Sequence, residues 1–220
     1  MGTYKVILFD LDGTLSDPKV GITKSVQYAL HEMGIDEPDI DKLECFIGPP
    51  LQVSFAEHFN FDEAHTRKAI ELYRERFKAK GMFENELYST IPLLLQSLKE
   101  QGYTLVVATS KPTVFAEQIL KHFEIDQYFE RIVGGFLDGS RASKTEIIQY
   151  ILDKYKENKL SDFIMIGDRS HDIVGARNTG IASIGVTYGY GSYDELRHSN
   201  ATHIVKSVDQ LKEILMGSKV

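Results

Sequence analysis

The arrangement of apolar and polar residues divides the chain into three parts. Residues 4–9 form a short apolar run rich in branched side chains, which is typical of a buried parallel strand. Between residues 18 and 80, apolar residues recur at helical spacing, and Gly34 and the turn Gly48-Pro49-Pro50 interrupt them. This second part predicts helices only, including one over residues 51–59 and one over residues 62–80 with Asp62 as its N-cap.

From Tyr88 on, predicted helices and strands alternate along the chain. Such alternation indicates right-handed crossovers and a parallel sheet that helices cover on both faces. The strand at residues 4–9 must join that sheet, because a single strand cannot bury itself. The further strands are predicted at residues 104–109, 131–134, 163–166, 182–186 and 203–205, and the helices at residues 92–101, 113–123, 144–155, 171–179 and 208–216.

The sequence therefore predicts an α/β protein of two domains. The core is expected to be a Rossmann-like, doubly wound parallel sheet formed by residues 1–16 and 88–220. The second domain is expected to be a helical cap, residues 17–87, inserted after the first strand. Because only two connections join the cap to the core, the cap is suited to hinged closure.

Composition and charge restrict the partners. The 220 residues include 25 basic and 32 acidic side chains, a net charge of −7, so the chain lacks the positive surface that attracts nucleic acid or an anionic membrane. The single cysteine, Cys45, cannot form a disulfide within the chain, which indicates a reducing compartment. The apolar run at residues 4–9 is too short for a signal peptide, and no run of about 18 apolar residues occurs. We expect a cytoplasmic monomer or homodimer that binds neither nucleic acid nor membranes.

Polar side chains follow three of the predicted strands at the point where each strand ends. Because the carboxyl ends of parallel strands meet at one edge of the sheet, where ligands bind in open α/β folds, we expect these side chains to share one site. They are Asp10 and Asp12 after the first strand, Thr109, Ser110 and Lys111 at the end of the strand that begins at residue 104, and Asp168 and Asp172 after the strand at 163–166.

The grouped carboxylates predict a cation and an anionic substrate. Two carboxylates about 4 Å apart repel by about 4 kcal/mol at an effective dielectric constant of about 20, so either their pKa values rise or a cation binds. Oxygen ligands without His or Cys favour a hard ion, and Mg²⁺ is the usual one in sites that also take phosphate. Hydroxyl and lysine donors on the opposite side favour a phosphate-bearing substrate. The pattern therefore predicts phosphoryl transfer.

Four motifs resemble the signature of the haloacid dehalogenase-like (HAD) phosphatase superfamily, and the resemblance covers essentially the whole chain. The inserted helical part is similar to the cap of the phosphoglycolate phosphatase-like branch, with residues 46–51 resembling that branch's cap loop. The motifs are Asp10-Leu11-Asp12-Gly13-Thr14-Leu15 followed by Asp17, Thr109 in the sequence Val-Val-Ala-Thr-Ser-Lys-Pro, Lys144, and Gly167-Asp168-Arg169-Ser170-His171-Asp172.

The resemblance implies a role for each of these residues. Asp10 would attack phosphorus and form an aspartyl-phosphate, and Asp12 would be the general acid and then the general base. Mg²⁺ would be held by the carboxylates of Asp10 and Asp168 and by the backbone carbonyl of Asp12, with Asp172 binding it directly or through water. The phosphoryl oxygens would be held by Thr109, Lys144 and backbone N–H groups near Leu11 and Ser110.

Two assignments have alternatives. The family often has Lys-Pro where this chain has Lys144-Thr145, and Arg141 and Lys111 are rival cations, although Lys111 is also interpretable as an ordinary surface charge. Asp17 is interpreted as the cap of the helix that Pro18 begins.

The sequence thus predicts a Mg²⁺-dependent phosphatase that acts on a small phosphorylated metabolite through an aspartyl-phosphate. Phosphoglycolate or a similar short ester is the first expectation for the substrate. A 5′-nucleotidase acting on nucleoside monophosphates, a phosphomutase of the β-phosphoglucomutase type and a non-enzymatic phosphate-binding module are the alternatives.

Overall fold

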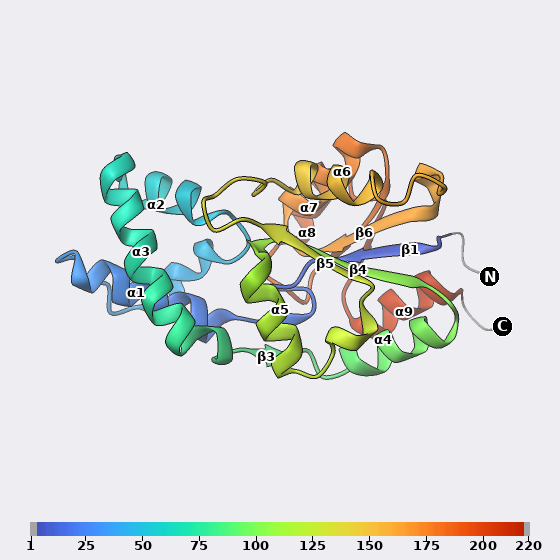
Figure 1. Cartoon of the computed structure of the whole chain (residues 1–220), viewed down its shortest axis with the longest axis horizontal. Coiled ribbons are helices and arrows are strands. Elements are labelled where there is room, and N and C mark those ends of the chain that lie inside the picture. Colours follow the sequence, from blue (N-terminus) through green and yellow to red (C-terminus); the bar gives the residue numbers. More distant parts are fainter. Residues whose placement is uncertain (1–3, 218–220) are drawn as a thin grey trace.

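The computed structural model describes residues 4–217, and its centre is a six-stranded sheet (Figure 1). All neighbouring strands run parallel, as predicted. The order is β5-β4-β1-β6-β7-β8, so the chain moves outward from β1 first to one side and then to the other. The strands are β1 (Val6–Phe9), β4 (Thr104–Pro112), β5 (Arg131–Gly135), β6 (Phe163–Gly167), β7 (Ala182–Val186) and β8 (His203–Val205).

Helices cover both faces of this sheet, as Figure 1 shows. Alternate residues of β1 point to opposite faces, as the pleat of a strand requires: Val6 and Leu8 pack in the apolar cluster that contains residues of α6 and α7, whereas Ile7 and Phe9 pack with residues of α4, α5 and α9. The helices after Tyr88 are α4 (Ile91–Glu100), α5 (Thr113–His122), α6 (Lys144–Leu152), α7 (Ser170–Thr179), α8 (Tyr193–His198) and α9 (Val208–Met216).

The segment between β1 and α4 forms a helical layer at one end of the sheet (Figure 1). Two short strands, β2 (Ser16–Asp17) and β3 (Glu86–Leu87), pair antiparallel where this segment leaves and rejoins the sheet. An aromatic contact also joins this segment to the sheet domain: Phe77 of the segment lies edge-on to Phe115 of α5, with 5.5 Å between the ring centroids. The other elements of the segment are α1 (Lys19–Glu32), the 3₁₀ helix η1 (Ile40–Phe46), α2 (Leu51–Phe59), α3 (Glu63–Ala79) and η2 (Gly81–Phe83).

Local capping explains several helix ends. Asp62 accepts a hydrogen bond from the N–H of His65 at 2.8 Å and caps α3, as predicted. Asp17 accepts one from the N–H of Lys19 at 3.0 Å at the start of α1. After α1 the chain turns at Gly34, whose φ of +80° favours glycine.

The structure differs from the sequence prediction in small elements. The helix expected over residues 144–155 ends at Leu152, and α8 was not predicted. The strands β2 and β3 have two residues each, which is too short for an alternating pattern to be visible. None of the described helices is long and apolar enough to cross a membrane.

Candidate active site

The predicted site residues meet at the carboxyl ends of β1, β4 and β6. Asp10 and Asp12 follow β1, Asp168 follows β6, and Lys144 is the first residue of α6. This is the edge where the strand order reverses on either side of β1, the usual ligand site of such sheets. All four side chains are buried.

Lys144 joins two of the carboxylates. Its Nζ lies 2.8 Å from Oδ1 of Asp10 and 2.6 Å from Oδ1 of Asp172, and it donates a hydrogen bond to the carbonyl of Ala108 at 2.8 Å. Two ion pairs and one hydrogen bond therefore surround the ammonium group. Burial lowers the pKa of Lys144, but the charges of Asp10 and Asp172 more than offset this and raise it. The lysine is therefore the resident positive charge of the site.

The two rival cations have different surroundings. Nζ of Lys111 lies 2.8 Å from Oδ2 of Asp12, and the lysine side chain is only 6% exposed; the interpretation of Lys111 as a surface charge is therefore wrong. Arg141 donates from Nε to the carbonyl of Gly134 at 3.0 Å. Its guanidinium also stacks over the rings of Phe136 and Tyr150, at 4.1 and 4.5 Å from their centroids. These contacts account for Arg141 without any role at the carboxylates.

The carboxylate of Asp10 is held in one orientation. Its Oδ1 accepts the N–H of Leu11 at 2.7 Å as well as the contact from Lys144. Both contacts use the same oxygen, so Oδ2 remains as the oxygen for a reacting atom. The backbone N–H of Asp10 donates to the carbonyl of Ile166 at 2.9 Å, which ties this residue to β6.

Asp12 has the properties of a general acid. One oxygen pairs with Lys111, and the other, Oδ1, is buried without a hydrogen-bond partner among residues 4–217. Burial raises the pKa of Asp12 above its ordinary value; Lys111 opposes the shift and the nearby Asp10 adds to it. A carboxyl group with a raised pKa keeps its proton closer to neutral pH and can give it to a leaving group.

Asp10, Asp168 and Asp172 form a cluster whose oxygens suit a metal ion. One carboxylate oxygen from each lies within 4.8 Å of the others, and all three residues are buried. Burial, followed by the charges of Asp172 and Asp10, raises the pKa of Asp168 well above its ordinary value. Burial likewise raises the pKa of Asp172 to about 6, although Lys144 opposes this rise. Lys144 pairs with only two of these three carboxylates, and oxygen-only donors with excess negative charge fit a hard divalent cation.

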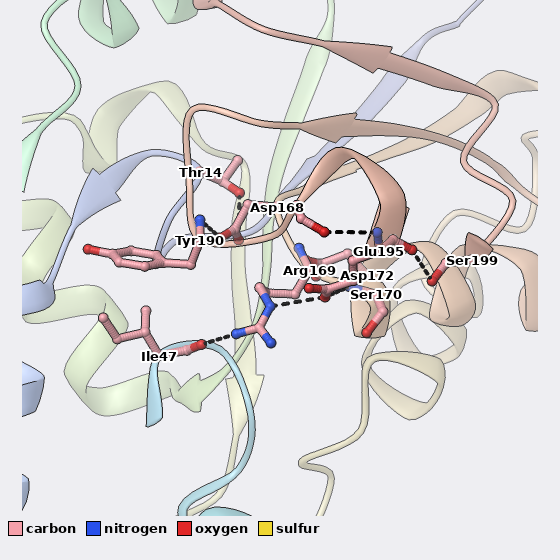
Figure 2. A network of polar contacts seen from close by, with 10 residues as sticks. Thr14, Ile47, Asp168, Arg169, Ser170, Asp172, Tyr190, Glu195 and Ser199 are labelled. Carbon is pink, nitrogen blue, oxygen red and sulfur yellow. Dashed lines mark hydrogen bonds and ion pairs between the residues drawn. The ribbon is translucent and has the colours of Figure 1, made fainter. Parts of the chain in front are cut away.

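The loop after β7 and the first motif hold Asp168 in place (Figure 2). The N–H of Tyr190 donates to Oδ2 of Asp168 at 2.8 Å, and Thr14 Oγ1 lies 3.5 Å from Oδ1. A Cβ on Gly13 would lie 2.2 Å from Oδ2, and the φ of this residue is +79°. Only glycine allows this approach. The requirement for glycine at position 13 is therefore steric.

Thr109 and Ser110 lie at the same edge. Thr109 is 2% exposed, and its Oγ1 accepts the N–H of Lys111 at 3.3 Å. Ser110 lines a cavity that also contains Asp12 and Lys111. The roles of Thr109 and Ser110 toward phosphoryl oxygens stay predictions.

The cavity over Asp12 lies between the sheet edge and the helical segment. The turn Gly48-Pro49-Pro50 lines it, as does Arg74 of α3. Sequence reasoning predicted the helix over residues 62–80 but did not single out Arg74, since a charged residue on a helix carries no signal of its own. The aromatic residues of the lining are Phe46, Tyr73, Phe77, Phe115 and Phe136.

Comparison with known proteins identifies the family. A model described as haloacid dehalogenase-like hydrolase matches residues 7–186. The chain belongs to this family. The predicted resemblance and the predicted HAD-like fold are confirmed.

Individual relatives match over nearly the whole chain. A 5′-nucleotidase of Pseudomonas aeruginosa is 51% identical over 96% of each protein. A tyrosine-protein kinase of Mycobacterium tuberculosis is 37% identical over 96% of this chain and 72% of its own length. A phosphoglycolate phosphatase of Vibrio parahaemolyticus is 29% identical over 97% of each.

A solved structure also matches over nearly the whole chain. The crystal structure of a predicted phosphatase from Clostridium acetobutylicum superimposes with a TM-score of 0.94 at 52% identity, over 98% of this chain and 99% of that one. Together the family match and these relatives confirm the prediction of an enzyme, a HAD phosphatase that hydrolyses phosphate monoesters.

The raised pKa values predict how the metal-free protein responds to pH. An acid whose pKa is raised by folding binds more protons in the folded state, so stability falls as pH rises from the unfolded pKa of about 4 through the folded one. In chelator, the protein is expected to be more stable at pH 5 than at pH 8, and Asp168→Asn is expected to reduce this difference. A change of about 1 kcal/mol in the free energy of unfolding corresponds to a shift of roughly 2–4 °C in the melting temperature.

Thermal melts at both pH values, with Asp36→Asn as control, test this expectation. Asp36 is an exposed carboxylate of the helical segment, so its replacement should leave the pH dependence as in the unmodified protein. Equal pH dependence for Asp168→Asn and Asp36→Asn would contradict it.

Proposed function

We propose that the protein is a Mg²⁺-dependent phosphatase that hydrolyses nucleoside 5′-monophosphates through an aspartyl-phosphate on Asp10. The observation that supports the chemistry is the pairing of a held carboxylate, Asp10, with an acid of raised pKa, Asp12, two residues further on. Asp10 and Asp168, with the backbone carbonyl of Asp12, are the proposed metal ligands, and Asp172 is proposed to act through water because Lys144 and the N–H of Arg169 already contact its oxygens.

The proposed reaction has two displacements. In the first, Oδ2 of Asp10 attacks phosphorus, the ester P–O bond breaks, and Asp12 gives its proton to the leaving oxygen. In the second, Asp12 takes a proton from water, and the water attacks the aspartyl-phosphate to release inorganic phosphate and regenerate Asp10. A bound Mg²⁺ supplies positive charge for the phosphoryl oxygens. Thr109, Ser110 and Lys144 are the proposed protein contacts of those oxygens.

The lining of the cavity supports a nucleoside as the leaving group. Five aromatic rings and the guanidinium of Arg74 line it, and Nε of Arg74 is buried without a hydrogen-bond partner among the described residues. A base offers a flat face to aromatic rings and ring acceptors to an arginine, whereas glycolate has no apolar surface to bury. The 51% identity to a 5′-nucleotidase, against 29% to a phosphoglycolate phosphatase, also favours nucleotides.

We further propose that residues 17–87 form a cap that closes this cavity. Among residues 4–217 the chain passes between the helical segment and the sheet domain at two places, the paired strands β2 and β3. A cap that excludes water would protect the aspartyl-phosphate until the leaving group has departed.

Phosphate release from a panel of esters tests the proposed substrate. At least one nucleoside 5′-monophosphate is expected to have a kcat/KM about tenfold or more above that of phosphoglycolate, a difference of about 1.4 kcal/mol. Arg74→Gln is expected to lower kcat/KM for that nucleotide and to change kcat/KM for phosphoglycolate less. A preference for phosphoglycolate would reject the nucleotide assignment, and isomerisation of a sugar phosphate without phosphate release would indicate a phosphomutase.

Metal removal is expected to abolish turnover. In EDTA the carboxylates of Asp10 and Asp168 repel each other and an incoming phosphate, so we expect activity to fall by about 100-fold or more and to return with Mg²⁺. Ca²⁺ is expected to restore it poorly, because it takes more ligands at longer distances. Full activity in chelator, measured as released phosphate, would contradict the proposed metal requirement.

A further inference from the structure

Arg169 reaches from the sheet domain to the helical segment. It follows Asp168 directly after β6, and its Nη1 donates a hydrogen bond to the backbone carbonyl of Ile47 at 2.7 Å (Figure 2). Ile47 is fully buried and precedes Gly48-Pro49-Pro50. We call residues 47–50 the Gly-Pro-Pro loop. Three of its residues line the cavity that contains Asp12 and Lys111, so Arg169 contacts the wall of the proposed leaving-group pocket from behind.

A second contact shows that the loop is fitted to Arg169. Gly48 has a φ of +104°, and a Cβ on it would lie 2.9 Å from Cγ of Arg169. The aliphatic part of Arg169 therefore packs against the backbone of the loop while its guanidinium holds the carbonyl. A larger residue at position 48 would be strained in its backbone and would push the arginine away.

Glu195 of α8 fixes the direction of the guanidinium. Its Oε1 accepts a hydrogen bond from Nε of Arg169 at 3.0 Å and another from the N–H of Ser170 at 2.7 Å (Figure 2). The side chains of Arg169 and Glu195 are 20% and 25% exposed, so the pair is largely shielded from water. Because Nε is held in this way, the planar guanidinium is restricted to one orientation, in which Nη1 points at the loop.

The backbone of Arg169 belongs to the carboxylate cluster. Its N–H donates to Oδ2 of Asp172 at 3.1 Å, and the preceding residue is Asp168. One residue thus connects the proposed metal site to the wall of the leaving-group pocket. The hydrogen bond from Arg169 to Ile47 joins residues 122 positions apart in sequence. It therefore holds the sheet domain and the helical segment together at the site itself.

We infer that Arg169 is a positioning residue that holds the Gly-Pro-Pro loop as the wall of the leaving-group pocket, and that Glu195 orients it. The inference rests on the phosphatase function proposed above. It makes selectivity depend on Arg169: a leaving group large enough to touch the wall needs the loop in place, whereas a small one needs only the carboxylate cluster. An alternative role, in which Arg169 acts only through Asp168, affects every ester equally.

Hydrogen exchange and kinetics on Arg169→Met test the inference together. This variant keeps the aliphatic part of the side chain and removes its donors. We expect amide exchange of Ile47, Val53 and Ser54, which donate to the carbonyls of Glu44 and Pro50, to rise about tenfold or more, as for the loss of a hydrogen bond to a charged group. KM for the preferred nucleoside 5′-monophosphate is expected to rise about tenfold, with a loss of about twofold or less in kcat/KM for acetyl phosphate.

Further variants separate positioning from charge. Arg169→Lys is expected to recover part of the loop protection, because a lysine can donate to the Ile47 carbonyl but cannot also hold Glu195 in the same fork geometry. Glu195→Ala is expected to raise exchange of the same amides, although the hydrogen bonds of this glutamate carboxylate are to Arg169 and Ser170 and not to the loop. The matched control is Arg67→Met, which breaks an exposed Arg–Glu pair of the helical segment with Glu63 at 2.9 Å and should change neither readout.

Two results would overturn the inference. The first is unchanged exchange of the loop in Arg169→Met, whatever happens to activity. The second is an equal loss of kcat for the nucleotide and acetyl phosphate, which would show that Arg169 acts through Asp168. If the unmodified protein hydrolyses neither the nucleotide nor acetyl phosphate, the proposed function fails, and the exchange measurement still decides whether Arg169 holds the loop.

Discussion

Asp10→Asn is expected to lower phosphate release by about 10⁴-fold or more, because the uncharged amide is a far weaker nucleophile than the proposed carboxylate. Asn is almost the same size and its amide oxygen can still accept from the N–H of Leu11 and from Lys144, which contact Oδ1 of Asp10 in the native protein. The fold should therefore survive, and a thermal melt should show a cooperative transition close to that of the unmodified protein.

Mass spectrometry after an acid quench identifies the intermediate. The native protein, mixed with substrate and quenched during turnover, is expected to gain the mass of one phosphoryl group on the peptide that contains Asp10, and Asp10→Asn is expected to gain none. Asp62→Asn serves as the control, since Asn caps a helix as well as Asp; it should keep full turnover and the phosphoryl adduct. Native-like turnover of Asp10→Asn would remove the nucleophile assignment.

Lys144→Met is expected to have the largest effect on stability. The lysine is 3% exposed at its side chain and lies within 2.8 Å of Asp10 and 2.6 Å of Asp172. Removing it leaves two buried carboxylates without their counter-charge, which costs about 3–5 kcal/mol. We expect a loss of that size in the free energy of unfolding at pH 7 in chelator, measured by urea denaturation, together with loss of turnover.

Two comparisons show whether charge is the cause. Lys144→Met combined with Asp172→Asn is expected to regain part of the stability without regaining activity, because one of the uncompensated carboxylates is then neutral. Lys68→Met, at an exposed position of α3, should change stability by about 0.5 kcal/mol or less. If Lys144→Met were as stable as Lys68→Met at pH 7, the ion pairs of Lys144 would not carry the stabilisation assigned to them.

The fold was predictable to the extent that its signals are local. The run ending at Phe9 and the alternation after Tyr88 predicted a parallel sheet with β1 inside it, and the strand order places β1 between β4 and β6. Short elements such as β2 and β3, with two residues each, were not predictable, because they are held by pairing across the helical segment rather than by a pattern of their own. The boundary between core and cap stays a prediction.

The candidate site was predictable in its residues and not in its contacts. Sequence spacing placed Asp10, Asp12 and Asp168 at strand ends and named Lys144 as the cation, but it left Lys111 and Arg141 as rivals. Packing separates them: Lys144 lies between Asp10 and Asp172, Lys111 pairs with Asp12, and Arg141 stacks on rings. Lys144 begins α6, Lys111 lies in β4 and Arg141 lies in the turn between β5 and α6. Their distances in sequence do not show which side chains each of them contacts.

The sequence by itself determined that carboxylates gather at one edge of a parallel sheet, because the end of each strand is marked locally by the change from apolar to polar residues. Only the tertiary structure decided which charges meet, that Arg169 donates a hydrogen bond to the carbonyl of Ile47, and that aromatic rings from the helical segment and from the sheet domain line one cavity. Those contacts join segments far apart in the chain, and their distances depend on how helices and loops pack together in three dimensions.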